Sequence, residues 1–445
     1  MKKEITIIGA GLVGSLLSIY LSRRGYKVKL FERRGDMRKE NMTAGRSINL
    51  ALSDRGIKAL EEVEIMDDIR KICIPMHGRF LHNADGGTGF QPYGKQGQFI
   101  NSVSRTELNK KLMDLAEHHG AEIFFNHKCE SIDWKTSAIK FELPNSQFII
   151  HNSQLIFGSD GAYSAARLQH QLQHDRFQYS QYYIDFGYKE LNIPPAKNGG
   201  FQMEKNALHI WPRGNYMLIA LPNIDGSFTC TLFFPFEGEP SFASLTTKEK
   251  VNGFFEKTFT DAGSLIPTLE EDFFENPTSS LVTIKCYPWI REDKFALIGD
   301  AAHAIVPFFG QGMNCGFEDC SVLNNLIDKY GDDWTKTLTE YQQLRKPDAD
   351  AIAELALNNF IEMRDKVADP KFLLQKKIEA KLHEKYPDKW IPAYSQVTFS
   401  PDIRYSDALK RGQKQETIMK EVMDLENIQQ RSDDDKLHQE IIQRV

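Results

Sequence analysis

The chain opens with two short apolar runs on either side of a helical pattern. Ile5 to Ile8 is a β-branched run, residues 15–24 carry apolar side chains at helical spacing, and Lys27 to Phe31 is a second short run. Short β-branched runs favour strands, whereas apolar residues three and four positions apart favour an amphipathic helix. The pattern therefore predicts one βαβ unit at the start of the chain.

The middle of the chain has the pattern of a capped helix followed by strands. Ser104 to Glu107 has the S-x-x-E spacing of a capping box, and the helical pattern that it opens ends near Gly120. Residues 121–158 then alternate like short strands. From Tyr182 to Pro235 the alternation is longer and aromatic, with a hairpin signal at Asp225-Gly226. We expect an antiparallel sheet there, as a candidate substrate lobe.

A further strand-and-helix pattern lies far along the chain. Phe295 to Ile298 leads directly into Gly299-Asp300, and a helical pattern returns at about Gly316 to Leu326. The lobe that the βαβ unit begins is therefore expected to be completed from distant segments. Beyond residue 334 the chain is helical and polar, with Pro347 and Pro370 expected to break the helices.

Composition narrows the class of protein. The 445 residues exceed what one hydrophobic core usually organises, which supports two lobes. A hydrophobic fraction of 41% beside 26% charged residues is typical of a globular protein. The formal charge of -6, without a basic stripe, argues against a nucleic-acid partner. An anionic ligand would then need local positive groups.

Cysteine spacing and the lengths of the apolar runs bear on metal sites and location. Six cysteines are scattered without a CxxC pair, which indicates neither a zinc site nor a disulfide framework and fits the reducing cytoplasm. No apolar run reaches the roughly 18 residues that a membrane-spanning helix needs. We therefore expect a cytoplasmic protein without a bound metal.

A glycine-rich turn joins the first predicted strand to the first helix. Gly9-x-Gly11-x-x-Gly14 follows Ile8, and Glu32 ends the next strand. Glycines at these positions allow a pyrophosphate to approach the helix N-terminus, and an acidic residue in the place of Glu32 can accept from a ribose hydroxyl. The turn predicts a dinucleotide site but does not distinguish FAD from NAD.

A second nucleotide motif runs from Phe295 to Asp300 and continues through His303 to Gly310-Gln-Gly312-Met-Asn314. A strand delivers Asp300 to a glycine-rich helix start, where its carboxylate would accept from a hydroxyl of a cofactor's sugar chain. The backbone amides of Gly312 to Asn314 would face an anionic flavin edge. We interpret His303 as a structural residue rather than a catalytic base.

A third motif, Gly158-Ser-Asp160-Gly161 with Arg167 beyond it, follows another strand-like run. Together the three motifs resemble the flavoprotein aromatic hydroxylase family. In that family the Asp-Gly segment serves both flavin and nicotinamide nucleotides, and an arginine matching Arg105 contacts FAD. Only one GxGxxG motif is present, so the resemblance implies that NAD(P)H binds transiently at a shared surface. The choice between NADPH and NADH stays open.

Five further segments narrow the resemblance to the kynurenine 3-monooxygenase family. They are residues 45–53, Gly78-Arg79, Pro92-Tyr93-Gly94, Pro307 to Asn314 and Asn358 to Arg364. The resemblance covers nearly the whole chain. It implies an FAD-dependent monooxygenase that converts L-kynurenine to 3-hydroxykynurenine in tryptophan catabolism, using NADPH and O2 through a flavin C4a-hydroperoxide.

The resemblance also implies roles for individual residues. In that family an arginine matching Arg79 and a tyrosine matching Tyr93 hold the substrate carboxylate, assisted by residues matching Asn359 and Tyr394. The pocket wall would be formed by Phe308 and Met363. A flat aromatic amino acid needs such walls and one cationic fork. The implied FAD-binding residues are Gly9, Gly11, Val13, Gly14, Glu32, Arg33, Ala51, Arg105, Asp160, Asp300, Gly312, Met313 and Asn314.

The implied fold class is α/β, with a Rossmann-like FAD-binding domain, an interleaved antiparallel-sheet substrate domain and a helical C-terminal extension. We expect the FAD-binding domain at residues 1–75, 101–178 and 286–330, and the substrate domain at 76–100 and 179–285. Residues 331–445 would form the helical region.

Two features depart from parts of the family. Mitochondrial members end in a membrane anchor, whereas Gln413 to Val445 is charged and helical as in soluble bacterial members, so we expect no anchor. Phe309 stands where some bacterial relatives have histidine, so the resemblance does not say which residues form the pocket wall beside the flavin. It also does not say whether the chain forms a homodimer. The competing functions are a flavin hydroxylase acting on another aromatic acid and a non-catalytic FAD-bound sensor.

Overall fold

The computed structural model describes residues 3–39, 49–95, 97–365 and 370–445, without the side chains of 363–365. The predicted βαβ unit is present, formed by β1 (Glu4–Ile8), α1 (Leu12–Arg23) and β2 (Lys27–Phe31). Strands β1 and β2 pair in parallel, with Ile5 opposite Val28 and Ile7 opposite Leu30. These four side chains are fully buried, because both faces of a parallel sheet are covered.

A six-stranded sheet is built around this unit, in the order β18-β19-β12-β1-β2-β8. The added strands come from distant segments, as expected: β8 (Glu122–Phe124), β12 (Leu155–Gly158), β18 (Ile290–Arg291) and β19 (Phe295–Leu297). Helix α1 packs against both α4 (Arg105–His118) and α10 (Gly312–Tyr330). The carboxyl ends of β1, β12 and β19 therefore carry all three nucleotide motifs at one edge of the sheet.

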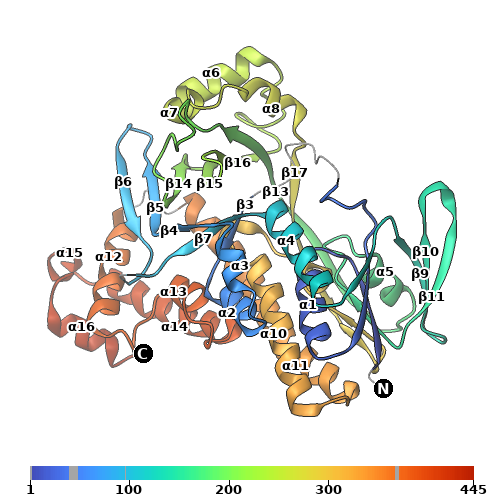
Figure 1. Ribbon diagram of the computed structural model, residues 1–445. Helices are drawn as coiled ribbons and strands as arrows, with labels where there is room; N and C mark the ends of the chain where they lie inside the picture. The colour runs from blue at the N-terminus through green and yellow to red at the C-terminus, as the bar shows by residue number, and fades with distance from the viewer. Residues whose placement is uncertain (1–2, 40–48, 96, 366–369) are drawn as a thin grey trace.

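The predicted antiparallel strands are also present, in a seven-stranded sheet of order β17-β13-β16-β15-β14-β5-β6 whose neighbours are antiparallel except for the parallel pair β14 and β5. Its members are β5 (Gly78–His82), β6 (Thr88–Pro92), β13 (Gln178–Ile193), β14 (Ala207–Pro212), β15 (Met217–Pro222), β16 (Phe228–Pro235) and β17 (Ser279–Tyr287). The hairpin between β15 and β16 turns at Asp225-Gly226, where Gly226 has φ +89°. Helices α6 (Lys248–Thr258), α7 (Thr260–Gly263) and α8 (Leu269–Glu275) cover one face (Figure 1).

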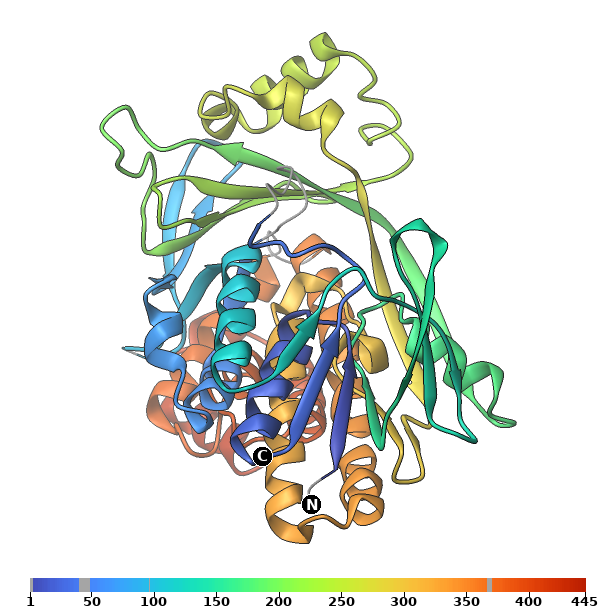
Figure 2. The same cartoon turned by 45° about the vertical axis from the view of Figure 1, so that its right-hand side comes forward.

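Two three-stranded sheets complete the strands. One contains β3 (Asn49–Leu52), β4 (Cys73–Met76) and β7 (Ile100–Ser104), and leads into α2 (Asp54–Glu62) and α3 (Met66–Arg70). The other contains β9 (Lys128–Asp133), β10 (Ala138–Glu142) and β11 (Phe148–Asn152). Figure 2 shows the seven-stranded sheet lying above the six-stranded one, with α6 to α8 on its outer side.

The C-terminal region is helical, as predicted. It contains α11 (Trp334–Asp365), α12 (Pro370–Lys385), α13 (Ala393–Thr398), α14 (Tyr405–Met423), α15 (Ile428–Arg431) and α16 (Asp435–Ile442). A separate apolar cluster that includes Leu382, Trp390 and Met419 holds α12, α14, α15 and α16 together, whereas α11 and α13 pack in the cluster around Phe308. Within the described residues, no helix has both the length and the apolar character that crossing a membrane requires.

The predicted break at Pro347 is wrong, because α11 continues through this residue. An interior proline removes one backbone hydrogen bond and usually costs about 3 kcal/mol. Tertiary contacts hold this turn in place. Arg404 donates to the carbonyl oxygen of Leu344, three residues before the proline, and the side chains of Arg345 and Asp348 are buried in the same turn. Pro370, in contrast, is the first residue of α12, a position that tolerates proline.

Candidate active site

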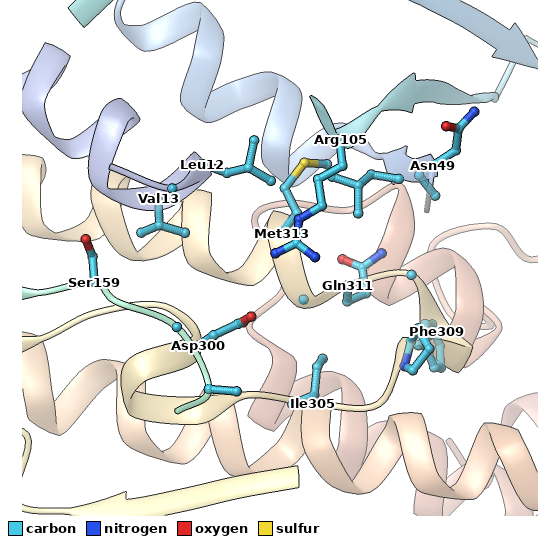
Figure 3. A pocket seen from close by; sticks show the side chains of 18 of the residues that line it. Leu12, Val13, Asn49, Arg105, Ser159, Asp300, Ile305, Phe309, Gln311 and Met313 are labelled. Atoms are coloured by element: carbon cyan, nitrogen blue, oxygen red, sulfur yellow. The ribbon is translucent and has the colours of Figure 1, made fainter. Parts of the chain in front are cut away.

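A cavity of about 670 Å³ is lined by residues of both large sheets and of the C-terminal region. It brings together every predicted FAD-binding residue except Gly14 and Asn314. Of the predicted substrate residues, Arg79, Tyr93, Tyr394 and Phe308 also line it. Figure 3 shows Val13 and Ser159 on one side of this space and Phe309 on the other, with Arg105 and Met313 between them.

The turn from β1 to α1 has the shape that a pyrophosphate needs. Gly9 has φ +100°, and a Cβ atom added to Gly9 would lie 2.8 Å from the backbone carbonyl oxygen of Ser159. A Cβ at Gly11 would meet no atom within 4 Å, although Gly11 lines the cavity. The first amides of α1 have no side-chain cap, so they remain available to an anion.

Gly14 stands behind this turn rather than in the cavity. A Cβ on Gly14 would lie 2.0 Å from the carbonyl oxygen of Gly9 and 2.4 Å from Oγ of Ser159. Hydrogen alone fits there. Gly14 therefore shapes the site by letting α1 approach the strands closely, which is the role the third glycine of this motif usually has.

Glu32 is held in place at the end of β2. Its side chain is 4% exposed, Oε2 accepts from the backbone amide of Ala10 at 3.1 Å, and Oε1 accepts from the amide of Arg34 at 3.0 Å. These bonds fix the carboxylate against the glycine turn. Arg33, the other residue predicted here, lines the cavity with an exposed side chain.

Asp160 lines the cavity, but its side chain caps a helix. The carboxylate accepts from the amides of Ala165 and Ala166 at 2.7 and 3.1 Å, at the N-terminus of α5 (Ala165–Leu172). Arg167 donates to the carbonyl oxygens of Ala301 and Ala162 at 2.8 and 2.6 Å. The Asp-Gly motif is thereby tied to the helix that Asp300 begins.

Asp300 begins the short helix α9 (Asp300–His303) and faces the cavity (Figure 3). The residue before it, Gly299, has φ +62°, and a Cβ there would lie 3.0 Å from Cγ2 of Val13. A Cβ on Gly316 would lie 2.6 Å from the same methyl group. Two glycines therefore make the space in which Val13 packs.

Asn314 is fully buried, and its side chain serves structure. Oδ1 accepts from the amide of Ser53 at 3.0 Å, and Nδ2 donates to the carbonyl oxygens of Ala51 and Gly310 at 2.8 and 2.9 Å. These bonds fix the end of β3 and the loop before α10, which both line the cavity. Helix α10 begins without a side-chain cap, so the amides that follow Gln311 are available.

Arg79 is the cation at the substrate side of the cavity. Its guanidinium carbon lies 4.7 Å from the ring centre of Tyr394 and 5.5 Å from that of Tyr93. The two tyrosine rings stack with centres 5.7 Å apart. Among the described residues, no acidic side chain is within ion-pair distance of Arg79, and the hydroxyls of Tyr394 and Tyr93 favour its charged form. The site therefore offers a positive fork without an acidic partner.

Two buried hydroxyl groups in the cavity wall also lack partners. The side chains of Tyr93 and Thr398 are 3% and 1% exposed, and both line the cavity. Within the described residues, neither hydroxyl makes a hydrogen bond. Burial raises the pKa of Tyr93, so its hydroxyl stays protonated and can donate. Buried polar groups are rarely left unpaired, which indicates a polar ligand at this position.

Apolar side chains from the seven-stranded sheet form the rest of the wall, and the sequence patterns did not identify them. They alternate along their strands: Leu208 and Ile210 on β14, Met217, Ile219 and Leu221 on β15, and Thr231 and Phe233 on β16. Alternation places these residues on one face, and the opposite face packs on α6 to α8. The alternation of these residues is visible in the sequence, but only the fold shows which of the two sheet faces lines the cavity.

Phe308 and Phe309 close the wall next to the flavin-binding segments. Phe308 packs on Phe233 and Phe360, with ring centres 5.1 and 4.4 Å apart. Phe309 stacks on Tyr394 at 5.5 Å with an interplanar angle of 21°. The open question about Phe309 is thereby answered in part, since this ring lines the cavity as an aromatic wall.

Of the remaining two predicted substrate residues, Asn359 does not line the cavity. Asn359 donates from Nδ2 to the carbonyl oxygen of Phe308 at 2.7 Å, so it stands behind the wall that it supports. The side chain of Met363 lies outside the described residues. The substrate roles of both residues stay predictions.

His303 is buried away from the cavity, and its contacts are those of a structural residue. Nε2 lies 2.6 Å from Oδ2 of Asp319, whose other oxygen accepts from Nε of Arg345 at 2.6 Å. Burial lowers the pKa of His303, but the Asp319 carboxylate outweighs this and holds it well above its usual value. Arg345 also donates to Sγ of Cys315 at 3.3 Å. Of the three neighbouring groups that could ligate a metal, His303, Cys315 and Asp319, the last two therefore already contact a fixed cation.

Comparison with known proteins agrees with this geometry. Residues 2–356 match the family described as FAD binding domain. A kynurenine 3-monooxygenase from Flavobacterium johnsoniae is 55% identical, covering 96% of this chain and 95% of its own length. Those from Myxococcus xanthus and Dictyostelium discoideum are 48% and 46% identical, each covering 95% of this chain and 91% and 94% of their own.

Solved structures show the same fold at lower identity. A 2-methyl-3-hydroxypyridine-5-carboxylic acid oxygenase matches 83% of this chain and 94% of its own with a TM-score of 0.66 at 18% identity. Pseudomonas aeruginosa PqsL, in complex with 2-aminobenzoylacetate, matches 82% of this chain and 97% of its own with a TM-score of 0.62 at 18% identity. By its sequence over nearly its whole length, and with a fold that agrees, the chain belongs to the kynurenine 3-monooxygenase family.

Proposed function

We propose that the protein is an FAD-dependent monooxygenase that converts L-kynurenine to 3-hydroxykynurenine with NADPH and O2, as a step of tryptophan catabolism. The observation that carries the proposal is the unpaired Arg79 fork beside the buried Tyr93 hydroxyl, in the same cavity as the nucleotide motifs. The relatives' names and the degree of identity support the same reaction.

The residues of the cavity fit FAD. Gly11 and Gly312 leave space in the cavity that side chains would otherwise fill. Gly11 directly precedes the uncapped N-terminus of α1, and Gly312 is the first residue of α10, which is also uncapped. We propose that the amides of α1 bind the pyrophosphate, Glu32 a ribose hydroxyl and Asp300 a hydroxyl of the ribityl chain. When bound, FAD supplies the redox chemistry, taking a hydride equivalent from NADPH and delivering one oxygen atom of O2 to the substrate.

The protein's own residues bind, orient and desolvate the substrate. The carboxylate of kynurenine would accept from the Arg79 guanidinium and the Tyr93 hydroxyl, because a bidentate fork fixes both position and direction. Its aromatic ring would lie against Phe308, Phe233 and Ile219, which exclude water from the reacting carbon. No side chain needs to act as a nucleophile, because the ring carbon beside the amino group is already electron-rich.

The finer assignments belong to the same proposal. Asn359 would act through the Phe308 carbonyl that it holds, and Met363 would complete the wall. We also propose the domain division expected from the sequence, supported by the two large sheets, whose strands follow those boundaries closely. A cytoplasmic location is supported by six cysteines without a disulfide bond among them.

Substrate-stimulated NADPH oxidation tests the choice of substrate. The FAD-loaded protein is mixed with NADPH and, separately, with L-kynurenine, anthranilate or phenolic acids. We expect kynurenine to stimulate the rate most strongly, because only it combines an amino-acid carboxylate with an aniline ring. Stronger stimulation by another aromatic acid would assign the cavity to that acid, and no stimulation by any would favour a non-catalytic flavoprotein.

A further inference from the structure

We propose that Arg55, which does not line the cavity, is a positioning residue that fixes the substrate wall formed by helix α13. This inference rests on the proposed function. Arg55 lies on α2, directly after β3, and its side chain is 1% exposed. A buried arginine needs several partners to offset its desolvation. The identity of those partners reveals what it does.

The guanidinium of Arg55 faces the carbonyl-bearing end of α13. Nε donates to the carbonyl oxygen of Val397 at 2.8 Å, and Nη2 donates to that of Gln396 at 3.3 Å. Nη2 also donates to the carbonyl oxygens of Ser400 at 3.3 Å and of Ile403. One side chain thus holds the end of this helix and the loop after it.

The C-terminal end of α13 is stabilised by a nearby cation. The last carbonyl groups of a helix have no partner within the helix and form its negative end. Helix α13 has only six residues, Ala393 to Thr398, so it has little stability of its own. Its place and orientation therefore depend on outside contacts, among which the fork of Arg55 is prominent.

The helix that Arg55 holds carries two residues of the cavity wall. Tyr394, near its start, stacks on Phe309 and lies under the Arg79 guanidinium. Thr398, at its end, presents the buried hydroxyl that lacks a partner. A small rotation of α13 would move both away from the substrate, and misplacement of about 1 Å can cost about a hundredfold in rate.

Further contacts make Arg55 rigid. Nη1 forms an ion pair with Oε1 of Glu318 at 2.5 Å, and Glu318 pairs in turn with Arg345 at 2.6 Å. The guanidinium carbon also lies 4.0 Å from the ring centre of Tyr405, whose hydroxyl donates to Oε1 of Gln311 at 2.9 Å. Gln311 lines the cavity beside Gly312. The same arginine therefore links the substrate wall to the loop before α10.

The test uses three FAD-loaded proteins: wild type, Arg55→Lys and Lys58→Met. Lysine keeps the charge but cannot make the fork. Lys58 is the matched control, since it joins the same helix to the same loop through an ion pair with Asp402 at 2.9 Å, with side chains 48% and 87% exposed. Exposed pairs of this kind contribute little.

Amide hydrogen exchange is measured first, without substrate. In Arg55→Lys we expect residues 393–403 to exchange faster by about tenfold, while α1 exchanges as in wild type and FAD content is unchanged. Lys58→Met should match wild type throughout. Unchanged exchange in 393–403, or equal acceleration over the whole protein, would overturn the positioning role.

Turnover with kynurenine and NADPH is measured second. We expect Arg55→Lys to raise KM for kynurenine about tenfold, because the substrate wall is loose. We also expect a larger share of the electrons from NADPH to reduce O2 to hydrogen peroxide instead of supporting hydroxylation. A merely structural residue would lower the active fraction and leave KM and this partition unchanged, which would overturn the proposal. If wild type fails to hydroxylate kynurenine while exchange still changes, the proposed function fails and the positioning role stands.

A second variant covers the case in which Arg55→Lys does not load FAD. Thr398→Val has nearly the same shape, removes only the hydroxyl, and leaves the Arg55 contacts in place. If α13 is the wall that Arg55 fixes, Thr398→Val raises KM for kynurenine with full FAD content. Wild-type KM in this variant and in Tyr394→Phe would show that α13 does not contact the substrate, and the inference would be wrong.

Discussion

The guanidinium carbon of Arg79 lies 4.7 Å from the ring centre of Tyr394, although β5 and α13 are far apart in the sequence. The contact is a cation over an aromatic face, which stabilises the arginine without an acidic partner. Its charge is therefore available to an anionic ligand, and together with the Tyr93 hydroxyl it forms a polar part of the cavity wall.

The first prediction concerns Arg79 as the carboxylate anchor. Arg79→Ala should lower kcat/KM for kynurenine by the equivalent of roughly 2 to 5 kcal/mol, because a desolvated carboxylate would be left unpaired. Arg79→Lys should lose less, since it keeps the charge but not the fork. Steady-state kinetics with a parallel FAD assay make the measurement.

Lys436→Ala, in the exposed C-terminal region, is the control for this prediction. FAD content should stay near wild type in all three variants, because Arg79 lies on the substrate sheet. An unchanged kcat/KM in Arg79→Ala with full FAD would remove Arg79 from the site.

The second prediction concerns FAD retention. Glu32→Ala should weaken FAD binding by roughly 1 to 3 kcal/mol, because it removes a buried acceptor for the ribose. The change also releases the Ala10 amide that Glu32 holds. Fluorescence titration of the apoprotein with FAD measures the Kd. Glu122→Ala, at an exposed position on neighbouring β8, is the control, and equal Kd values for the two variants would refute the assignment.

The third prediction separates two helix glycines. Gly14→Ala should destabilise the protein by about 1 to 3 kcal/mol and impair FAD binding, because its Cβ would overlap the Gly9 carbonyl. Gly253→Ala, inside α6, should instead be neutral or stabilising by up to about 1 kcal/mol, since a Cβ there meets no atom within 4 Å. Urea unfolding of both variants makes the comparison. Similar losses of stability would contradict the close packing at Gly14.

The fourth prediction is a pH dependence of stability. Asp319 holds the pKa of His303 well above its unfolded value of about 6.5, so the pair's contribution is complete below about pH 6.5 and is lost as pH rises through the raised pKa. His303→Gln keeps a donor to Asp319 but cannot titrate. We expect the free energy of unfolding to fall more in wild type than in His303→Gln between pH 6 and 9. Parallel slopes would show that His303 is neutral in the folded state.

Local patterns predicted most of the architecture because most elements have the secondary structure that their own residues favour. The β-branched run at Ile5 to Ile8, the capping box at Ser104 and the turn at Asp225-Gly226 each form what their residues favour. Pro347 does not, because contacts from distant segments, such as that of Arg404 with the Leu344 carbonyl, hold this turn in place. A contact of that kind leaves no signal in the local sequence.

The site was predicted unevenly for a similar reason. Motifs located the residues that touch the cavity through the backbone, such as Gly11 and Gly312. The structural work of Asn314 depends on Ala51 and Ser53, which only the fold brings near. Arg55 is the extreme case, since its partners all belong to other elements and its local sequence marks it as an ordinary helix residue.

Product analysis tests the central claim most directly. The FAD-loaded protein is incubated with L-kynurenine and NADPH under isotopically labelled O2. The products are separated by chromatography, and their masses are determined by mass spectrometry. We predict a single product heavier than kynurenine by one labelled oxygen atom, co-eluting with 3-hydroxykynurenine and formed only when NADPH is present. Unchanged kynurenine after NADPH has been consumed, with the oxygen recovered as hydrogen peroxide, would contradict the account.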